Sequence, residues 1–200
     1  MDTLTEAMGN IGLSDGSEEL EQLLFSPQAD SGIAETVLDN IPRYLFRIAS
    51  PRSDGFTNET WVRSESAYQN RSSSMEDIFF NLDSKKRTDI ARILNLHLRW
   101  WPKNGSEDNF VSWTSSLLFA IQYIYYRHLE PRDGSSLAKI KLYVIDTTRF
   151  PRGTFIRDMD LIDFFCDSDE SLKQFQSLRN RPSYYFGEYL SQGALKIENK

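Results

Sequence analysis

The stretch from Asp108 to His128, DNFVSWTSSLLFAIQYIYYRH, constrains the fold most, because it predicts a strand that passes directly into a helix. The residues FVSWT are largely β-forming, and their alternation places the hydroxyls of Ser112 and Thr114 on one face of the strand. Ser115 and Ser116 can cap the helix that follows, since its first amide groups have no partner within the helix. Apolar residues and a final histidine then recur at helical spacing: Leu117, Ala120, Ile121, Ile124 and His128. The segment is either a plain connection with capping serines or one wall of a functional site.

The composition indicates one soluble globular domain. The 200 residues are 40% hydrophobic, which is enough for a proper core. The sequence has no run of about 18 apolar residues, the length a membrane-spanning helix needs. MDTLTEAMGN lacks the basic and apolar regions of a secretory signal. A single cysteine, Cys166, fits a reducing compartment. We therefore expect an intracellular protein, in the cytoplasm, that does not attach to membranes.

Negative charge is concentrated near the N-terminus. The first 42 residues contain nine acidic residues and no Lys or Arg, whereas the remaining 158 carry a net charge of about +3. We therefore predict an acidic leader over residues 1–40 and a folded domain over residues 41–200. The segment SDGSEELEQLLF indicates a partly helical leader that is a partner-binding helix, a lid or a loosely packed terminal helix. The mild positive charge of the domain suits an anionic small ligand and is too weak to indicate nucleic-acid binding.

An arginine lies in the middle of the first predicted strand, IPRYLFRIAS, residues 41–50. Alternation places Arg47 on the face opposite to Phe46 and Ile48. A mid-strand arginine is usually solvated or salt-bridged. Its guanidinium is also a fixed fork of donors that suits a phosphate or an amide. The polar residues 51–75 predict a loop with one short strand near Trp61, and this loop either covers a pocket or is mobile.

Three further segments have patterns that predict secondary structure. Residues 75–101 predict helical structure with His97 on an apolar face, where a hydrogen-bonded core histidine is commoner than a base or a metal ligand. AKIKLYVID, residues 138–146, predicts a strong strand. RDMDLIDFF predicts a short helix whose aspartates fit no calcium loop and complement the positive helix N-terminus instead. We therefore expect no metal site.

The least expected residue is a glutamate near the C-terminus. In PSYYFGEYLSQGALKIENK, alternation predicts one strand face formed by Tyr184, Phe186, Glu188 and Leu190, followed by a turn at Gly193 and another strand. Removing a carboxylate from water is costly, and carboxylates in such places are often functional. A partner such as Arg47 would also explain this one.

Three segments, YLFR ending at Arg47, FVSWTS around Ser112 and EYLSQGAL beginning at Glu188, occur in an order that resembles the ADP-ribosyltransferase family. The resemblance is to the Arg–Ser–Glu branch, which includes the cholera-toxin-like and pierisin-like enzymes, and it spans roughly residues 41–198. The chain also resembles a poorly characterised fungal domain that shares these segments.

This resemblance implies an α+β fold of two small, mostly antiparallel sheets packed face to face with flanking helices. NAD would bind as co-substrate in the cleft between the sheets, and no metal would be needed. By the same resemblance, Arg47 would hold the phosphates or ribose of NAD, and Ser112 would position Glu188 or contact the ribose. Glu188 would stabilise the positive charge that develops as the nicotinamide leaves. The resemblance also places Trp113, Thr114 and Tyr189 at the cofactor, although core packing is an alternative for the two aromatic residues.

The chain departs from the family pattern at Phe186, where many members carry Gln or Glu to engage the acceptor. An apolar residue cannot activate a guanidino or amide nucleophile, which leaves another acceptor, hydrolysis of NAD, or a fold without chemistry. The resemblance therefore implies a transferase or an NAD glycohydrolase. The alternative is a catalytically inactive domain of this fold that binds a protein partner, and a third interpretation is an unrelated α+β domain with chance matches.

Overall fold

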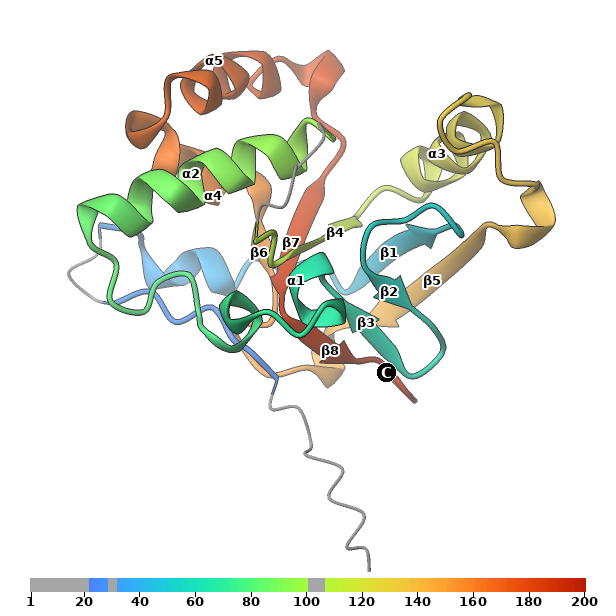
Figure 1. Cartoon of the computed structure of the whole chain (residues 1–200), viewed down its shortest axis with the longest axis horizontal. Helices are drawn as coiled ribbons and strands as arrows, with labels where there is room; N and C mark the ends of the chain where they lie inside the picture. Colours follow the sequence, from blue (N-terminus) through green and yellow to red (C-terminus); the bar gives the residue numbers. More distant parts are fainter. Residues whose placement is uncertain (1–21, 29–31, 101–106) are drawn as a thin grey trace, which may run out of the picture.

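The computed structural model describes residues 22–28, 32–100 and 107–200. Within them, two antiparallel sheets and several helices form a mixed α/β structure, which agrees with the predicted α+β class (Figure 1). The first sheet has five strands in the order β5-β1-β4-β7-β6, and the second has three in the order β2-β3-β8. The strands are β1 (Tyr44–Ala49), β2 (Phe56–Thr57), β3 (Trp61–Arg63), β4 (Phe110–Thr114), β5 (Lys141–Asp146), β6 (Ile156–Arg157), β7 (Glu188–Gln192) and β8 (Ala194–Lys196).

Helices lie between these strands. The α-helices are α1 (Glu65–Tyr68), α2 (Ser84–Leu98), α3 (Leu117–Leu129), α4 (Asp158–Phe165) and α5 (Glu170–Arg179). The 3-10 helices are η1 (Glu35–Leu38), η2 (Ser72–Met75), η3 (Leu137–Lys139), η4 (Thr147–Arg149), η5 (Cys166–Ser168) and η6 (Pro182–Tyr184). The predicted cap of α3 is confirmed, because Ser116 Oγ accepts a hydrogen bond from the amide of Phe119 at 3.1 Å. None of the described helices is long and apolar enough to cross a membrane.

Three apolar clusters hold the layers together. One cluster lies between the two sheets and joins residues from both: Leu45, Val62, Val111, Trp113, Ile145, Tyr189 and Leu195. A second lies between the five-stranded sheet and helices α2, α4 and α5, and includes Leu94, Phe110, Ile156, Leu161, Phe165, Leu172 and Leu190. A third, smaller one joins β1 to α3 through Ile48 and Ala120. The chain passes from the first sheet to the second at Gly193, whose φ of +67° suits glycine.

The predicted leader is not separate from the core in its described part. Phe25, Ile33 and Leu38 are all buried in the large cluster under α2, α4 and α5. The amide of Phe25 donates a hydrogen bond to the carbonyl of Gly153 at 2.7 Å. Residues 22–28 form no helix, and the rest of the predicted leader helix lies outside the described residues. The boundary predicted at residue 40 therefore does not separate the leader from the hydrophobic core of the domain.

Two other local predictions were wrong in part. The helix predicted from residue 75 begins only at Ser84, because Asp83 caps it by accepting a hydrogen bond from the amide of Lys86. The strand predicted to include Tyr184 and Phe186 begins at Glu188, since η6 occupies residues 182–184.

Helix α3 is less covered than its apolar sequence predicts. Ala120 is its one fully buried residue, whereas Leu117 and Ile121 of the predicted stripe are both more than 40% exposed. The residues that pack inward are Phe119, Tyr123 and Ile124, which are half-buried. The face that contacts the sheet is therefore rotated relative to the predicted stripe, and it directs aromatic side chains toward β4.

Candidate active site

The three segments that carry the predicted site lie on neighbouring strands of one sheet. Strand β4 pairs with β1 on one side and with β7 on the other. In the β4–β7 pair, Thr114 lies opposite Glu188 and Ser112 lies opposite Leu190. The β1–β4 pair has a single register position, Phe46 opposite Thr114. Beyond this position the two strands are no longer paired, which leaves room for a pocket between them.

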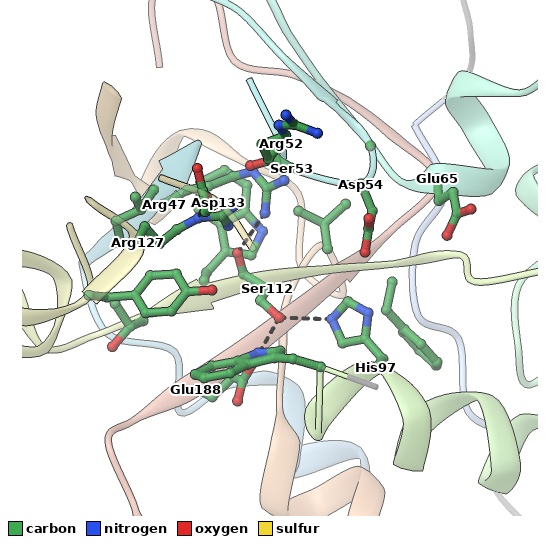
Figure 2. Close-up of a pocket in the computed structure, with 18 of the residues that line it drawn as sticks. Arg47, Arg52, Ser53, Asp54, Glu65, His97, Ser112, Arg127, Asp133 and Glu188 are labelled. Carbon is green, nitrogen blue, oxygen red and sulfur yellow. Dashed lines mark hydrogen bonds and ion pairs between the residues drawn. The ribbon is translucent and has the colours of Figure 1, made fainter. Parts of the chain in front are cut away.

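A pocket of about 360 Å³ lies at this place, and Arg47, Ser112, His97 and Glu188 are among the residues that line it (Figure 2). Its size is within the range of small-molecule sites in proteins. The three residues predicted as a catalytic set, Arg47, Ser112 and Glu188, therefore lie at one cavity. Arg47 and Glu188 therefore do not lie on opposite sides of the molecule, the arrangement that would have favoured chance matches.

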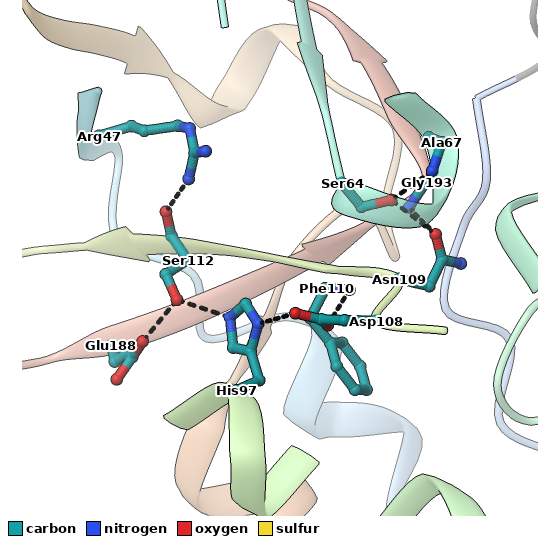
Figure 3. A network of polar contacts seen from close by, with 10 residues as sticks. All are labelled: Arg47, Ser64, Ala67, His97, Asp108, Asn109, Phe110, Ser112, Glu188 and Gly193. Atoms are coloured by element: carbon teal, nitrogen blue, oxygen red, sulfur yellow. Dashed lines mark hydrogen bonds and ion pairs between the residues drawn. The ribbon is translucent and has the colours of Figure 1, made fainter. Parts of the chain in front are cut away.

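Arg47 reaches the pocket across the gap between β1 and β4. Its Nη1 donates a hydrogen bond to the carbonyl oxygen of Ser112 at 3.0 Å (Figure 3). Its Nε donates one to Thr57 Oγ1, also at 3.0 Å. Burial lowers the pKa of Arg47 to about 10, because the cation loses hydration. The guanidinium is still a cation at neutral pH, and two of its nitrogens are fixed by the protein.

The hydroxyl of Ser112 lies between two polar side chains. It donates a hydrogen bond to Glu188 Oε1 at 2.7 Å, and it lies 2.8 Å from His97 Nε2. His97 Nδ1 in turn lies 2.7 Å from Asp108 Oδ2 (Figure 3). A hydroxyl has one proton to donate, so when Ser112 donates to Glu188, the contact with His97 must use a proton on Nε2. The geometry therefore defines a chain of hydrogen bonds from Asp108 through His97 and Ser112 to Glu188.

His97 and Asp108 are the residues that sequence reasoning did not place in the site. His97 is 8% exposed, so the prediction of a hydrogen-bonded core histidine is confirmed. Its partners could not be inferred, because His97 lies at the end of α2 whereas Asp108 lies just before β4 and Ser112 within it. The sequence signal for this pair was an aspartate, Asp108, two residues ahead of the strand that carries Ser112. The structure shows that this aspartate is buried.

Glu188 is held at both of its oxygens. Oε1 accepts from Ser112, and Oε2 forms a very short ion pair with Nη2 of Arg179. Both side chains are almost completely buried, with Glu188 at 2% and Arg179 at 3% exposure. The carboxylate that resembles a catalytic glutamate thus borders the pocket and also belongs to a buried ion pair.

Asp158 is a second buried carboxylate beside Arg179. Its Oδ2 lies 3.5 Å from Arg179 Nη2, and the residue is fully buried. Burial, and next the charge of Glu188, raise the pKa of Asp158 to about 7. Two buried carboxylates, those of Glu188 and Asp158, therefore face the one guanidinium of Arg179.

A wall of aromatic side chains lines the pocket near Glu188. It is formed by Trp100, Phe119, Tyr123, Tyr126 and Phe186. Phe119 and Phe186 are stacked with their centroids 3.9 Å apart, and Trp100 lies 5.1 Å from Tyr123. Trp100 and Tyr126 are each nearly half exposed, so the wall continues to the surface. Flat rings of a ligand could stack on such a wall.

The other predicted cofactor residues are placed differently. Trp113 borders the pocket on β4, but its indole Nε1 donates to Ser191 Oγ and its ring packs in the cluster between the sheets. Tyr189 is buried in the same cluster and does not line the pocket. Thr114 lines the pocket, but its hydroxyl donates to the carbonyl of Phe186. Strand alternation explains these positions, because Trp113 points away from the face that Ser112 presents.

The described residues contain no group of three or more His, Cys, Asp or Glu side chains that could hold a metal ion. Beside the groups already described, charged side chains of both signs line this pocket: Arg52, Asp54, Arg63, Glu65, Arg127, Glu130, Arg132 and Asp133.

A comparison with protein families gives one match: residues 40–198 match the model of a family described as a domain of unknown function (DUF7587). The comparisons with curated proteins and with solved structures gave no significant match. The family match covers most of the chain and includes Arg47, Ser112 and Glu188. The chain therefore belongs to this family.

Proposed function

We propose that this protein is an ADP-ribosyltransferase-like enzyme that cleaves the bond between nicotinamide and ribose in NAD. The observation that carries the proposal is the convergence at Ser112. Arg47 donates a hydrogen bond to the carbonyl oxygen of Ser112, and the hydroxyl of Ser112 donates one to Glu188. All three residues line one pocket. The order Arg, Ser, Glu on three adjacent strands agrees with the resemblance to the Arg–Ser–Glu branch of that family.

The chemistry of the pocket suits a dinucleotide. A guanidinium can bind a phosphate or a ribose hydroxyl, and Nη2 is the nitrogen of Arg47 that the bonds to Ser112 and Thr57 do not use. Arg52 and Arg127 also line the pocket, together with acidic residues such as Asp133. The aromatic wall offers faces on which nicotinamide or adenine can stack. In this proposal, the wall takes the role that the sequence assigned to Trp113 and Tyr189.

Glu188 would act electrostatically. When the nicotinamide leaves, the electron pair of the broken bond departs with it, and positive charge develops on the ribose. A carboxylate fixed beside this charge stabilises the transition state more than the ground state, and it therefore accelerates the reaction. Ser112 would hold Oε1 in place, and His97 with Asp108 would hold Ser112. The new bond is then made to the ribose by water or by an acceptor.

The surroundings of Phe186 limit the acceptor. Phe186 stacks on Phe119, and the guanidinium of Arg179 lies 4.2 Å from its ring centroid. Arg179 thus already lies beside this position and is paired with Glu188, and Phe186 itself has no carboxylate or amide to engage an acceptor. The proposal therefore favours water or a nucleophile other than a guanidino group.

The direct test is NAD consumption by the purified protein beside the variant Glu188→Gln. Loss of the main electrostatic group should reduce turnover by at least about 100-fold. Glu198→Gln, which changes an exposed glutamate in the same way, is the matched control and should retain full turnover. Wild-type protein that neither consumes NAD nor binds it would contradict the proposal.

The second candidate is a catalytically inactive domain of this fold that binds a protein partner. The buried ion pair between Glu188 and Arg179 favours it, because it partly neutralises the carboxylate that the chemistry needs. NAD binding separates the two candidates. Saturable binding that raises the melting temperature supports a nucleotide site, whereas binding to neither wild type nor variant favours the inactive domain.

A further inference from the structure

Arg179 is the cationic residue that forms an ion pair with Glu188. It lies at the last position of α5 and is 3% exposed, and its bond to Glu188 places it beside the start of β7. Its Nη1 donates to the carbonyl of Tyr184 at 3.2 Å, while its Nη2 bonds Glu188 Oε2. Its guanidinium also lies between the rings of Phe175 and Phe186, at 5.1 and 4.2 Å. The guanidinium is therefore held in one place by contacts from three segments.

The same nitrogen of Arg179 faces two carboxylates unequally. Nη2 is hydrogen-bonded to Glu188 but lies 3.5 Å from Asp158 Oδ2, which has no hydrogen-bond partner within the described structure. A fully buried carboxylate oxygen without a donor is costly when it is charged. Asp158 is thus an incompletely satisfied competitor for a cation that Glu188 holds.

We propose that Arg179 is a positioning residue for Glu188 and that Asp158 competes with Glu188 for its guanidinium, so that Asp158 sets how much negative charge Glu188 presents to the pocket. This rests on the proposed function, because the charge of Glu188 matters there for stabilising the ribose cation. When Asp158 is neutral, Arg179 is committed to Glu188 and offsets its charge. When Asp158 is ionised, the guanidinium is shared, and the negative potential at the pocket increases.

The other charged or titratable groups around Asp158 do not remove this competition. They are Arg157 of β6, Asp160 of α4, Tyr185, which follows η6, and Tyr189 of β7. Arg157 and Asp160 pair with each other at 2.7 Å. Burial raises the pKa values of both tyrosines, that of Tyr185 to about 12, so they stay neutral near pH 7. Glu188 and Arg179 therefore remain the partners that decide the state of Asp158.

A pH dependence follows. Because the pKa of Asp158 is raised to about 7, ionisation of this residue takes place near neutral pH. NAD turnover should therefore rise as the pH increases from 6 to 8.5, by roughly tenfold if sharing of the cation changes the barrier by about 1.4 kcal/mol. Asp158→Asn, which can never compete as a charge, should hold turnover at the low-pH rate over the whole range.

The first experiment measures the pH profile of NAD consumption for wild type, Asp158→Asn and Asp163→Asn. Asp163 lies on the same helix, is exposed and accepts a hydrogen bond from Gln176, so its variant should follow the wild-type profile. A flat profile for Asp158→Asn supports the proposal. An Asp158→Asn profile that rises in parallel with the wild type overturns it.

A second experiment does not need turnover. The titration of Asp158 is followed by NMR of protein labelled with carboxyl-¹³C aspartate, and Asp158→Asn identifies its signal. In Glu188→Gln, the negative charge of Glu188 is lost and Arg179 is left to Asp158 alone, and both changes should move the titration midpoint of Asp158 to lower pH. An unchanged midpoint would overturn the sharing of Arg179. A moved midpoint in a protein that does not consume NAD would support the sharing and reject the proposed function.

Discussion

At the scale of single residues, one hydroxyl group connects the parts of the candidate site. Ser112 offers its carbonyl oxygen to Arg47 and its hydroxyl to Glu188, and His97 contacts the same hydroxyl. The backbone contact is independent of the side chain, so Arg47 would stay in place in a variant that lacks the hydroxyl. Ser112 is therefore a position at which orientation of Glu188 can be separated from binding by Arg47.

We expect Ser112→Ala to lower NAD turnover by roughly tenfold or more while changing NAD affinity less, because Glu188 loses one of its two fixed partners. The variant also leaves His97 Nε2 without its partner, which should lower the free energy of unfolding by about 1–3 kcal/mol. Steady-state kinetics and urea denaturation measure the two effects. Ser115→Ala is the control, since Ser115 bonds only the carbonyl of Gly187 and does not line the pocket. Equal losses of turnover in both variants would contradict an orienting role for Ser112.

Asp158 gives a second prediction at this scale, for stability. Its pKa is raised from 3.8 to about 7 in the folded protein, chiefly by burial. Between about pH 4 and pH 7 the folded protein therefore keeps a proton that the unfolded chain has released, so the free energy of unfolding falls as the pH rises through this window. The full difference is at most roughly 4 kcal/mol.

Asp158→Asn should remove this loss, so the variant should become more stable relative to wild type as the pH rises. Urea denaturation of both proteins at pH 5 and at pH 8 measures it. A stability difference that is the same at both pH values would show that the burial of Asp158 is not linked to a proton.

At the scale of elements, the pocket depends on how β1 and β4 separate. They pair only at Phe46 and Thr114, whereas β1 pairs with β5 along its full length. The part of β4 that pairs with β7 but not with β1 carries Ser112. The side chain of Arg47 crosses the gap between β1 and β4 to reach the carbonyl of Ser112. Helix α3 then starts immediately after β4 and supplies Phe119, Tyr123 and Tyr126 to the aromatic wall. The strand-to-helix unit from Asp108 to His128 thus provides both the polar and the aromatic parts of the site.

At the scale of the whole molecule, Phe25, Ile33 and Leu38 from the predicted leader contribute to the core that supports this sheet. Phe25 is 2% exposed and packs edge-on against Phe79 with the ring centroids 6.4 Å apart. A segment that the charge distribution marked as a leader is therefore part of the hydrophobic core at its described end.

Phe25→Ala should lower the free energy of unfolding by about 3–5 kcal/mol, the usual cost of removing a buried aromatic ring from a core. Phe80→Ala, at an aromatic residue that is 53% exposed, should cost less than about 1 kcal/mol. Thermal or urea unfolding measures both. A small effect at Phe25 would mean that the N-terminal segment is dispensable for folding.

The sequence by itself determined the features that depend on neighbours along the chain. Alternation placed Arg47 within β1, the run FVSWTSS predicted a strand followed by a capped helix, and Glu188 was recognised as an unusual carboxylate on a strand. The tertiary structure decided which groups face them. Arg179, His97 and the aromatic wall join the site through contacts between distant segments, and a period of two or 3.6 residues gives the face of a side chain but not what lies opposite. Arg179 shows the reason, because an arginine in the last turn of a helix is locally ordinary, and only packing of α5 against β7 makes it the partner of Glu188.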